Sequence, residues 1–242
     1  MSALAALILT AGSAAAAAAE APLVLHFNER PPLHYFTPQR TLTGFVARPA
    51  LDALDAAGIA YVIRQTPAKR QLVLLQANQE AGCMLSWFKT SGRERSGKFS
   101  EVVYQDKRPF ALTWAGNSGM ENEAPIKDTI ANPRLRLLVK EGFSYGPQID
   151  RALTLNKARP STTTGEAAQM LDMLYHRRAD YFFITEEEAD TLIKSSRYPA
   201  NAFKRIYFSD IAKGYDRHLW CTLATPDDVI KRFNSALAKQ RK

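Results

Sequence analysis

Between residues 22 and 88, apolar strand patterns alternate with helix patterns, and this order limits the possible folds more than any other feature. The expected strands are short runs rich in aliphatic and aromatic residues, at 22–27, 60–65 and 82–88. The helices expected between them, 47–58 and 66–78, each carry a proline in the first turn. Strand–helix–strand spacing of this kind predicts a parallel sheet flanked by helices.

After a polar loop at residues 115–125, a second α/β unit begins. Its expected strands are 134–140, 180–185 and 205–210, and its expected helices begin at Gly146, Gly165 and Glu186. A last strand (218–224) and helix (225–240) then remain. If that strand returned to the first unit, the chain would cross between two lobes near residues 107–113 and again near 213–218. Such a double connection forms a hinge with a cleft between the lobes.

The first residues predict export. Residues 1–19 combine an apolar stretch at 4–9 with an alanine-rich tract that contains several Ala-x-Ala cleavage sites, although no Lys or Arg precedes the apolar stretch. This pattern is typical of a secretory signal peptide, too short in strongly apolar residues to span a membrane well. We therefore expect a periplasmic protein whose mature chain begins near Glu20.

The charge and the metal-ligating residues argue against several functions. Lys and Arg number 32 against 24 Asp and Glu, a net charge of +8, but they are spread along the whole chain. No segment alternates basic and aromatic residues as nucleic-acid modules do, so we expect no nucleic-acid partner. No cluster with metal-ligand spacing, phosphate-binding loop or nucleophile–base motif is present, so we expect no metal, no cofactor and no catalytic residues. The two cysteines, Cys83 and Cys221, are compatible with one disulfide or with two buried thiols.

The chain resembles the bacterial extracellular solute-binding proteins of the amino-acid-binding type (family 3), which have the two-lobed type II periplasmic-binding-protein fold. The likeness covers nearly the whole mature chain and rests on the order of four segments. These are "ERPPLHY", "TSGRERSGKFSEVVY", "GFSYG" and "RRADYFFITEEEA". The match is nearest to orphan members of the family that begin with Arg-Pro-Pro.

The resemblance implies a division into lobes. Lobe one would comprise residues 20–108 and 218–242, and lobe two residues 109–217. The returning strand would lie beside the third strand of lobe one, which would bring Cys83 and Cys221 together as a disulfide or close thiol pair. The protein would be a monomer.

The resemblance also implies a ligand site in the cleft. The family's Thr-x-x-Arg corresponds to Thr90 and Arg93, and the arginine pairs with the ligand carboxylate in that family. Trp87 and Phe88, at the end of the preceding strand, would wall an apolar pocket. Where the family has an Asp that holds the ligand ammonium, this chain has Thr185, with Glu186 as the nearest carboxylate.

Two further segments complete the expected site. Ser144 and Tyr145 open a helix whose amino-terminal amides would face the cleft and favour an anion. Tyr35 and Glu29 follow the first strand, beside a rigid Pro31-Pro32 step that holds its loop extended.

The leading hypothesis is a non-catalytic protein that captures a small, carboxylate-bearing organic solute. It would deliver that solute to an ABC importer (its permease) or to a membrane sensor. One alternative is a periplasmic enzyme on the same fold, similar to cyclohexadienyl dehydratase, with Glu186 or Glu29 as general acid. A second alternative is an interaction protein that binds no ligand.

Overall fold

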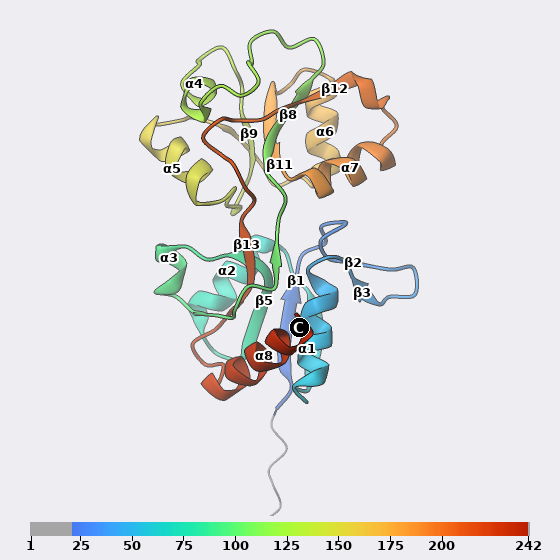
Figure 1. Cartoon of the computed structure of the whole chain (residues 1–242), viewed down its shortest axis with the longest axis vertical. Helices are drawn as coiled ribbons and strands as arrows, with labels where there is room; N and C mark the ends of the chain where they lie inside the picture. Colours follow the sequence, from blue (N-terminus) through green and yellow to red (C-terminus); the bar gives the residue numbers. More distant parts are fainter. Residues whose placement is uncertain (1–20, 242) are drawn as a thin grey trace, which may run out of the picture.

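The structure, a computed structural model, describes residues 21–241 and has two lobes linked by two crossing segments (Figure 1). The expected signal peptide, residues 1–19, lies outside the described residues. No helix within 21–241 has the length and apolar character that crossing a membrane requires. The expected α/β, two-lobed fold class is confirmed.

The first lobe is built on a six-stranded sheet. Its strands are β1 (Leu23–Phe27), β4 (Tyr61–Gln65), β5 (Gly82–Phe88), β6 (Lys98–Phe99), β7 (Tyr104–Gln105) and β13 (Asp216–Cys221). Its helices are α1 (Ala47–Ala56), α2 (Ala68–Ala77), α3 (Ser91–Glu94) and α8 (Asp227–Gln240), and β2 (Tyr35–Phe36) pairs with β3 (Leu42–Thr43) in a separate hairpin. Strands β4, β1 and β5 are parallel, as predicted. Strand β13 joins β5 antiparallel, so the chain does return to the first lobe.

The second lobe has a three-stranded antiparallel sheet of β8 (Phe110–Trp114), β11 (Tyr181–Ile184) and β12 (Phe203–Ile206). A parallel pair, β9 (Leu138–Lys140) and β10 (Ser161–Thr163), is bridged to β11 at Leu137 and Tyr181. The helices are α4 (Ile126–Ile130), α5 (Pro147–Leu155), α6 (Ala167–Tyr175), α7 (Glu186–Ser195) and the 3₁₀ turn η1 (Ala200–Ala202).

Strand β8 is the main departure from the expected elements. The sequence pattern assigns residues 107–113 to a crossing segment, but from Phe110 onward the chain pairs with both β11 and β12. After a short crossing segment at residues 106–109, the chain therefore enters the centre of the second sheet directly. Phe110, Ala111 and Leu112 are completely buried there, which accounts for the apolar sequence that follows the crossing.

A disulfide fastens the returning strand. Cys83 in β5 and Cys221 in β13 are opposite each other in the antiparallel register, and their Sγ atoms are bonded at 2.01 Å. Both residues belong to the core between the first sheet and helices α1 and α8. The bond closes a loop with a sequence separation of 138, which contains the whole second lobe.

We expect the Cys83→Ala/Cys221→Ala variant to lose about 2–4 kcal/mol of unfolding free energy, because cross-linking residues far apart in sequence restricts the unfolded chain most. Urea unfolding followed by circular dichroism measures the change. Wild-type protein unfolded in a reducing agent is the control and should behave like the variant. Equal stability of oxidised wild type and variant would contradict the assignment.

Candidate functional site

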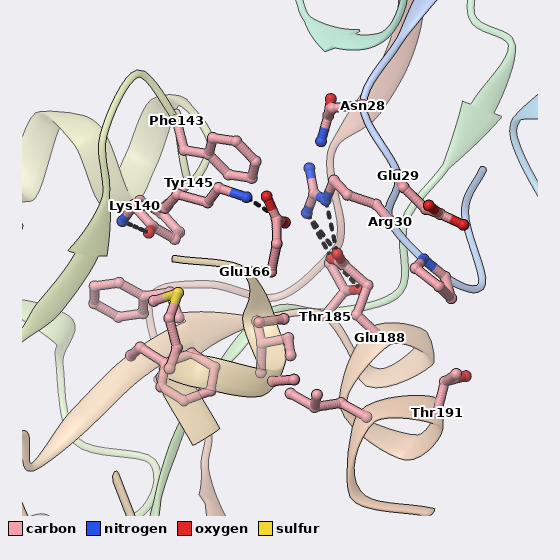
Figure 2. A pocket seen from close by; sticks show the side chains of 18 of the residues that line it. Asn28, Glu29, Arg30, Lys140, Phe143, Tyr145, Glu166, Thr185, Glu188 and Thr191 are labelled. Atoms are coloured by element: carbon pink, nitrogen blue, oxygen red, sulfur yellow. Dashed lines mark hydrogen bonds and ion pairs between the residues drawn. The ribbon is translucent and has the colours of Figure 1, made fainter. Parts of the chain in front are cut away.

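A cavity of about 650 Å³ lies between the lobes, within the size range of small-molecule sites. Its first-lobe wall comes from the segment after β1, the end of β4 with the residues that precede α2, and the end of β5. The second-lobe wall comes from α6, β11, α7 and the turn before α5 (Figure 2). Much of the lining is apolar: Phe88, Phe143, Met170, Phe182, Leu192 and the ring of Tyr215.

Of the two aromatic residues that end β5, only Phe88 lines this cavity. Adjacent side chains of a strand point to opposite faces of the sheet, so Trp87 faces away from the cavity. It packs against Trp220 with ring centroids 5.1 Å apart, and its indole nitrogen donates to Gln71 Oε1 at 2.8 Å. Trp87 therefore does not line the large cavity, but it does line a small hollow beside it, together with Phe88 and Arg93. Phe88 instead makes an edge contact with Tyr215 across the cavity.

A buried ion pair links the two crossing segments beside Phe88. Arg217 Nε donates to Asp106 Oδ1 at 2.5 Å, and both side chains are almost completely buried. Arg217 Nη1 also donates to the backbone and side-chain oxygens of Ser86, both at 3.1 Å. Its guanidinium lies 4.6 Å from the centre of the Phe88 ring. Burial would lower the pKa of Arg217, but the charge of Asp106 and nearby carboxylates raises it, so the group is a permanent cation.

Arg93 does not line the large cavity; it lines a small hollow of about 30 Å³ beside it. Its guanidinium carbon is 4.6 Å from the Trp87 ring and 5.6 Å from the Trp220 ring, and Nη1 donates to the backbone oxygen of Phe88 at 3.0 Å. Among residues 21–241 no carboxylate forms an ion pair with it. Burial lowers the pKa of Arg93 to about 10, which the charge of Asp150 partly opposes.

The hollow contains a second unmatched donor. Asn28 follows β1, and its Nδ2 atom is buried with no hydrogen-bond partner in the described part of the chain. Arg30 and Arg217 also line the hollow. The volume suits about two water-sized groups, comparable to the two oxygens of a carboxylate. Arg93 and Asn28 together can therefore donate to a carboxylate placed there.

Thr90 and Tyr35 have local structural roles. The Thr90 side chain accepts from the backbone nitrogen of Arg93 at 3.4 Å and so caps α3, which sets the position of Arg93. Tyr35 pairs with Thr43 in the β2–β3 hairpin and does not line the cavity. The Pro31-Pro32 loop is a tight turn closed by pairing of Arg30 with His34, not an extended segment. The expected ligand contacts of Thr90 and Tyr35 are therefore not supported.

Ser144 and Tyr145 line the cavity as expected, but their polar groups contact the chain itself. The Ser144 hydroxyl donates to Asp150 Oδ2, and the Tyr145 backbone nitrogen donates to Asp150 Oδ1 at 2.9 Å. The anion at this turn is thus the side chain of Asp150, whose pKa is raised by burial against the effect of these hydrogen bonds. The ring of Tyr215 lies so close to Gly146, at φ +101°, that any Cβ there would overlap it. The amino terminus of α5 is therefore covered and does not face the cleft.

At the start of α7, the cavity is lined by Thr185 and Glu188 and not by Glu186. Helix positions two residues apart point in nearly opposite directions, whereas positions three apart share a face. Glu186 accordingly faces outward and accepts a hydrogen bond from the Tyr207 hydroxyl at 2.8 Å. Thr185 donates its hydroxyl to Glu188 Oε2 at 3.2 Å, so the two form one polar group on the cavity side.

Glu188 is joined to Arg30 of the first lobe (Figure 2). Arg30 Nε donates to one carboxylate oxygen and Nη2 to the other, each at 2.8 Å. The Arg30 guanidinium carbon also lies 4.9 Å from the ring of Phe143, from the second lobe. This two-pronged pair is the principal polar contact between the lobes inside the cavity.

Glu29, also expected in the site, lines the cavity from an exposed position at its rim. Its carboxylate accepts a long, 3.4 Å hydrogen bond from Gln65 Nε2.

Sequence reasoning did not identify Arg30, Glu188 or Arg217 as site residues. Arg30 could have been identified from its place just after the first parallel strand, because ligands bind at the carboxyl ends of such strands. The three-residue spacing from Thr185 was a signal for Glu188. Nothing local marks Arg217, which reaches the site only because β13 returns beside β5. Within the described residues, no group of three or more His, Cys, Asp or Glu side chains is placed to hold a metal ion.

No protein-family model and no curated protein matches the sequence. Solved structures do match the fold. An ancestral arginine-binding protein bound to arginine is 13% identical, with a TM-score of 0.72, and the alignment covers 92% of this chain and 93% of that one. The substrate-binding protein of an ABC uptake transporter from Streptococcus pneumoniae, with bound histidine, is 14% identical, with a TM-score of 0.71 and coverage of 91% and 87%.

A third structure is an ancestral amino-acid-binding protein described as a precursor of cyclohexadienyl dehydratase. It is 15% identical, with a TM-score of 0.68, and the alignment covers 91% of this chain and 89% of that one. At these identities the likeness establishes the two-lobed fold of amino-acid-binding proteins over nearly the whole described chain.

We expect Asp106→Asn to lower the unfolding free energy by about 3–5 kcal/mol, because it leaves the buried Arg217 cation without its counter-ion. Chemical denaturation measures the loss. Asp190→Asn is the matched control: it removes an exposed pair with Arg205 and should cost no more than about 1 kcal/mol. Equal losses of unfolding free energy for the two substitutions would show that the Arg217–Asp106 pair contributes no more to stability than an exposed ion pair.

Proposed function

We propose that this protein is a solute-binding protein, and that it captures a small carboxylate-bearing molecule between its lobes. The observation that carries the proposal is the hollow beside the large cavity. There the partly buried Arg93 has no carboxylate partner, and Asn28 Nδ2 has no hydrogen-bond partner, among the described residues. A carboxylate in the hollow would satisfy both donors, and the rest of the solute would occupy the 650 Å³ cavity.

The cellular role that we propose is the one typical of solute-binding proteins. We propose export to the periplasm, with residues 20–108 and 218–242 as one lobe and 109–217 as the other. The closed pair of lobes would be recognised by an ABC permease or a membrane sensor. The likeness to substrate-binding proteins of ABC transporters supports this partner. Membership of the Arg-Pro-Pro subgroup stays a prediction.

The enzyme alternative has one supporting observation, the likeness to a dehydratase precursor. However, of the two candidate general acids, Glu186 is outside the cavity and Glu29 is exposed at its rim. Neither carboxyl group is enclosed by the cavity, where a general acid would be held against a bound substrate. Binding without catalysis is therefore the better-supported function. Formation of phenylpyruvate from prephenate by the purified protein would reverse this order.

We expect a thermal-shift screen of organic acids and amino acids to identify at least one carboxylate that raises the melting temperature. A ligand at 100 times its Kd adds about 2.7 kcal/mol of stability, which gives a clear shift. The methyl esters of the same compounds are the control and should give no shift, because they lack the anion. Equal shifts with acid and ester would contradict a carboxylate site.

For a carboxylate found in this way, we expect Arg93→Gln to weaken binding about 10- to 100-fold, which corresponds to the loss of a charge-assisted hydrogen bond. Isothermal titration calorimetry measures the affinity, and circular dichroism checks the fold. Arg95→Gln is the control, because Arg95 is exposed two residues away and, within residues 21–241, donates only to the Ser91 backbone. Unchanged affinity in a folded Arg93→Gln protein would remove Arg93 from the site.

A further inference from the structure

The carboxylates that face the large cavity determine which ligand charges it accepts. A ligand with an ammonium group needs an anionic partner once it is removed from water, since an unpaired buried charge is strongly unfavourable. Among residues 21–241, three carboxylates line the cavity: Glu29, Glu166 and Glu188.

Glu188, the buried member of the three, is fully engaged by the chain. Both of its oxygens accept from Arg30 at 2.8 Å, and Oε2 also accepts from Thr185 at 3.2 Å. Arg30 in turn packs over Phe143, so its position is fixed on two sides. An ammonium group at Glu188 would compete with Arg30, and it offers a single point charge in place of a matched two-pronged contact.

The other two carboxylates are poor substitutes. Glu29 is exposed at the rim, where water and salt screen its charge. The side chain of Glu166 is 67% exposed, is paired with Lys140 Nζ at 2.5 Å, and forms the capping box of α6 with Gln169. In Figure 2 Glu166 and Lys140 lie on the second-lobe side of the cavity, with their contact already made.

The remaining charge in this region is positive. Arg217 and Arg30 line both the cavity and the hollow, and Arg93 lines the hollow. Around them the walls are rings and aliphatic chains, including Phe88, Phe182 and Leu192. The site thus combines an anion-binding end with an apolar body and has no free buried anion in the described residues.

We propose that the ligand is a carboxylic acid with an apolar body and no amino group, and that Arg30 sets this preference by holding Glu188. The inference rests on the proposed function, because it assumes that a carboxylate occupies the hollow. It concerns whether the ligand also carries an ammonium group, a question that the proposed function leaves open. By this reasoning an α-amino acid loses affinity relative to the same skeleton without nitrogen, because its ammonium group is desolvated opposite an engaged carboxylate.

The test uses pairs of compounds that differ only in the amino group: 3-phenylpropanoate with L-phenylalanine, and 4-methylpentanoate with L-leucine. Isothermal titration calorimetry on the purified protein should show the acid without nitrogen binding at least tenfold more tightly in each pair that binds. Tighter or equal binding of the amino acids would overturn the inference and leave the proposed function intact. Failure of all four compounds, and of every acid in the wider screen, would overturn both.

Arg30→Gln tests the role assigned to Arg30. The substitution releases Glu188 to accept an ammonium group, so the affinity ratio within each pair should move at least tenfold toward the amino acid. Adding Glu188→Gln should abolish that shift. Arg40→Gln is the matched control, because Arg40 packs over Phe36, does not line the cavity, and should leave the ratio unchanged. A loss of affinity that is equal for both members of a pair would show that Arg30 is only structural.

Discussion

The buried Arg217–Asp106 pair is the contact on which the arrangement of the two lobes depends. Asp106 ends the first lobe just before the chain crosses to β8, and Arg217 lies in β13, just after it crosses back. The pair therefore fixes both crossings to each other at the floor of the cavity. Because Arg217 also holds Ser86 and lies over Phe88, the hinge and the cavity wall share one side chain. The Phe88 ring of the cavity wall and the segments that join the lobes therefore contact the same guanidinium.

Other contacts between the lobes lie around this pair, and they differ in how much they contribute to stability. Arg30 with Glu188 is largely buried and two-pronged, whereas Lys69 with Glu141 is exposed on both sides and contributes little. Glu187, one residue before Glu188, accepts from the Tyr104 hydroxyl at 2.7 Å and from the Lys107 backbone at 3.0 Å. The first turn of α7 thus contacts the opposite lobe and the crossing segment with successive residues. Any shift of α7 relative to the first lobe would therefore change both contacts at once.

The sequence predicted the elements well where a periodic pattern was complete, and the site less well. The parallel strands β1, β4 and β5 and the return of β13 were anticipated, but β8 was assigned to a crossing because its apolar run adjoins one. Side-chain direction explains most errors at the site. Trp87 and Phe88 are neighbours on a strand, and Glu186 and Glu188 are two apart on a helix, so one of each pair had to face away. Which one does so depends on packing against Trp220 and Tyr207, partners that are distant in sequence.

Arg93 shows how stability and binding are balanced at this site. Removing a guanidinium from water is unfavourable, and the contacts with two indole rings and one carbonyl oxygen offset only part of that effect, as its lowered pKa indicates. Filling the hollow with an apolar side chain would stabilise the protein more simply. A cation kept there at a cost in stability is understandable if an anion supplies the missing interaction. The free energy that the chain gives up in placing Arg93 is then recovered on binding, so affinity for the carboxylate and the poor satisfaction of Arg93 have the same physical origin.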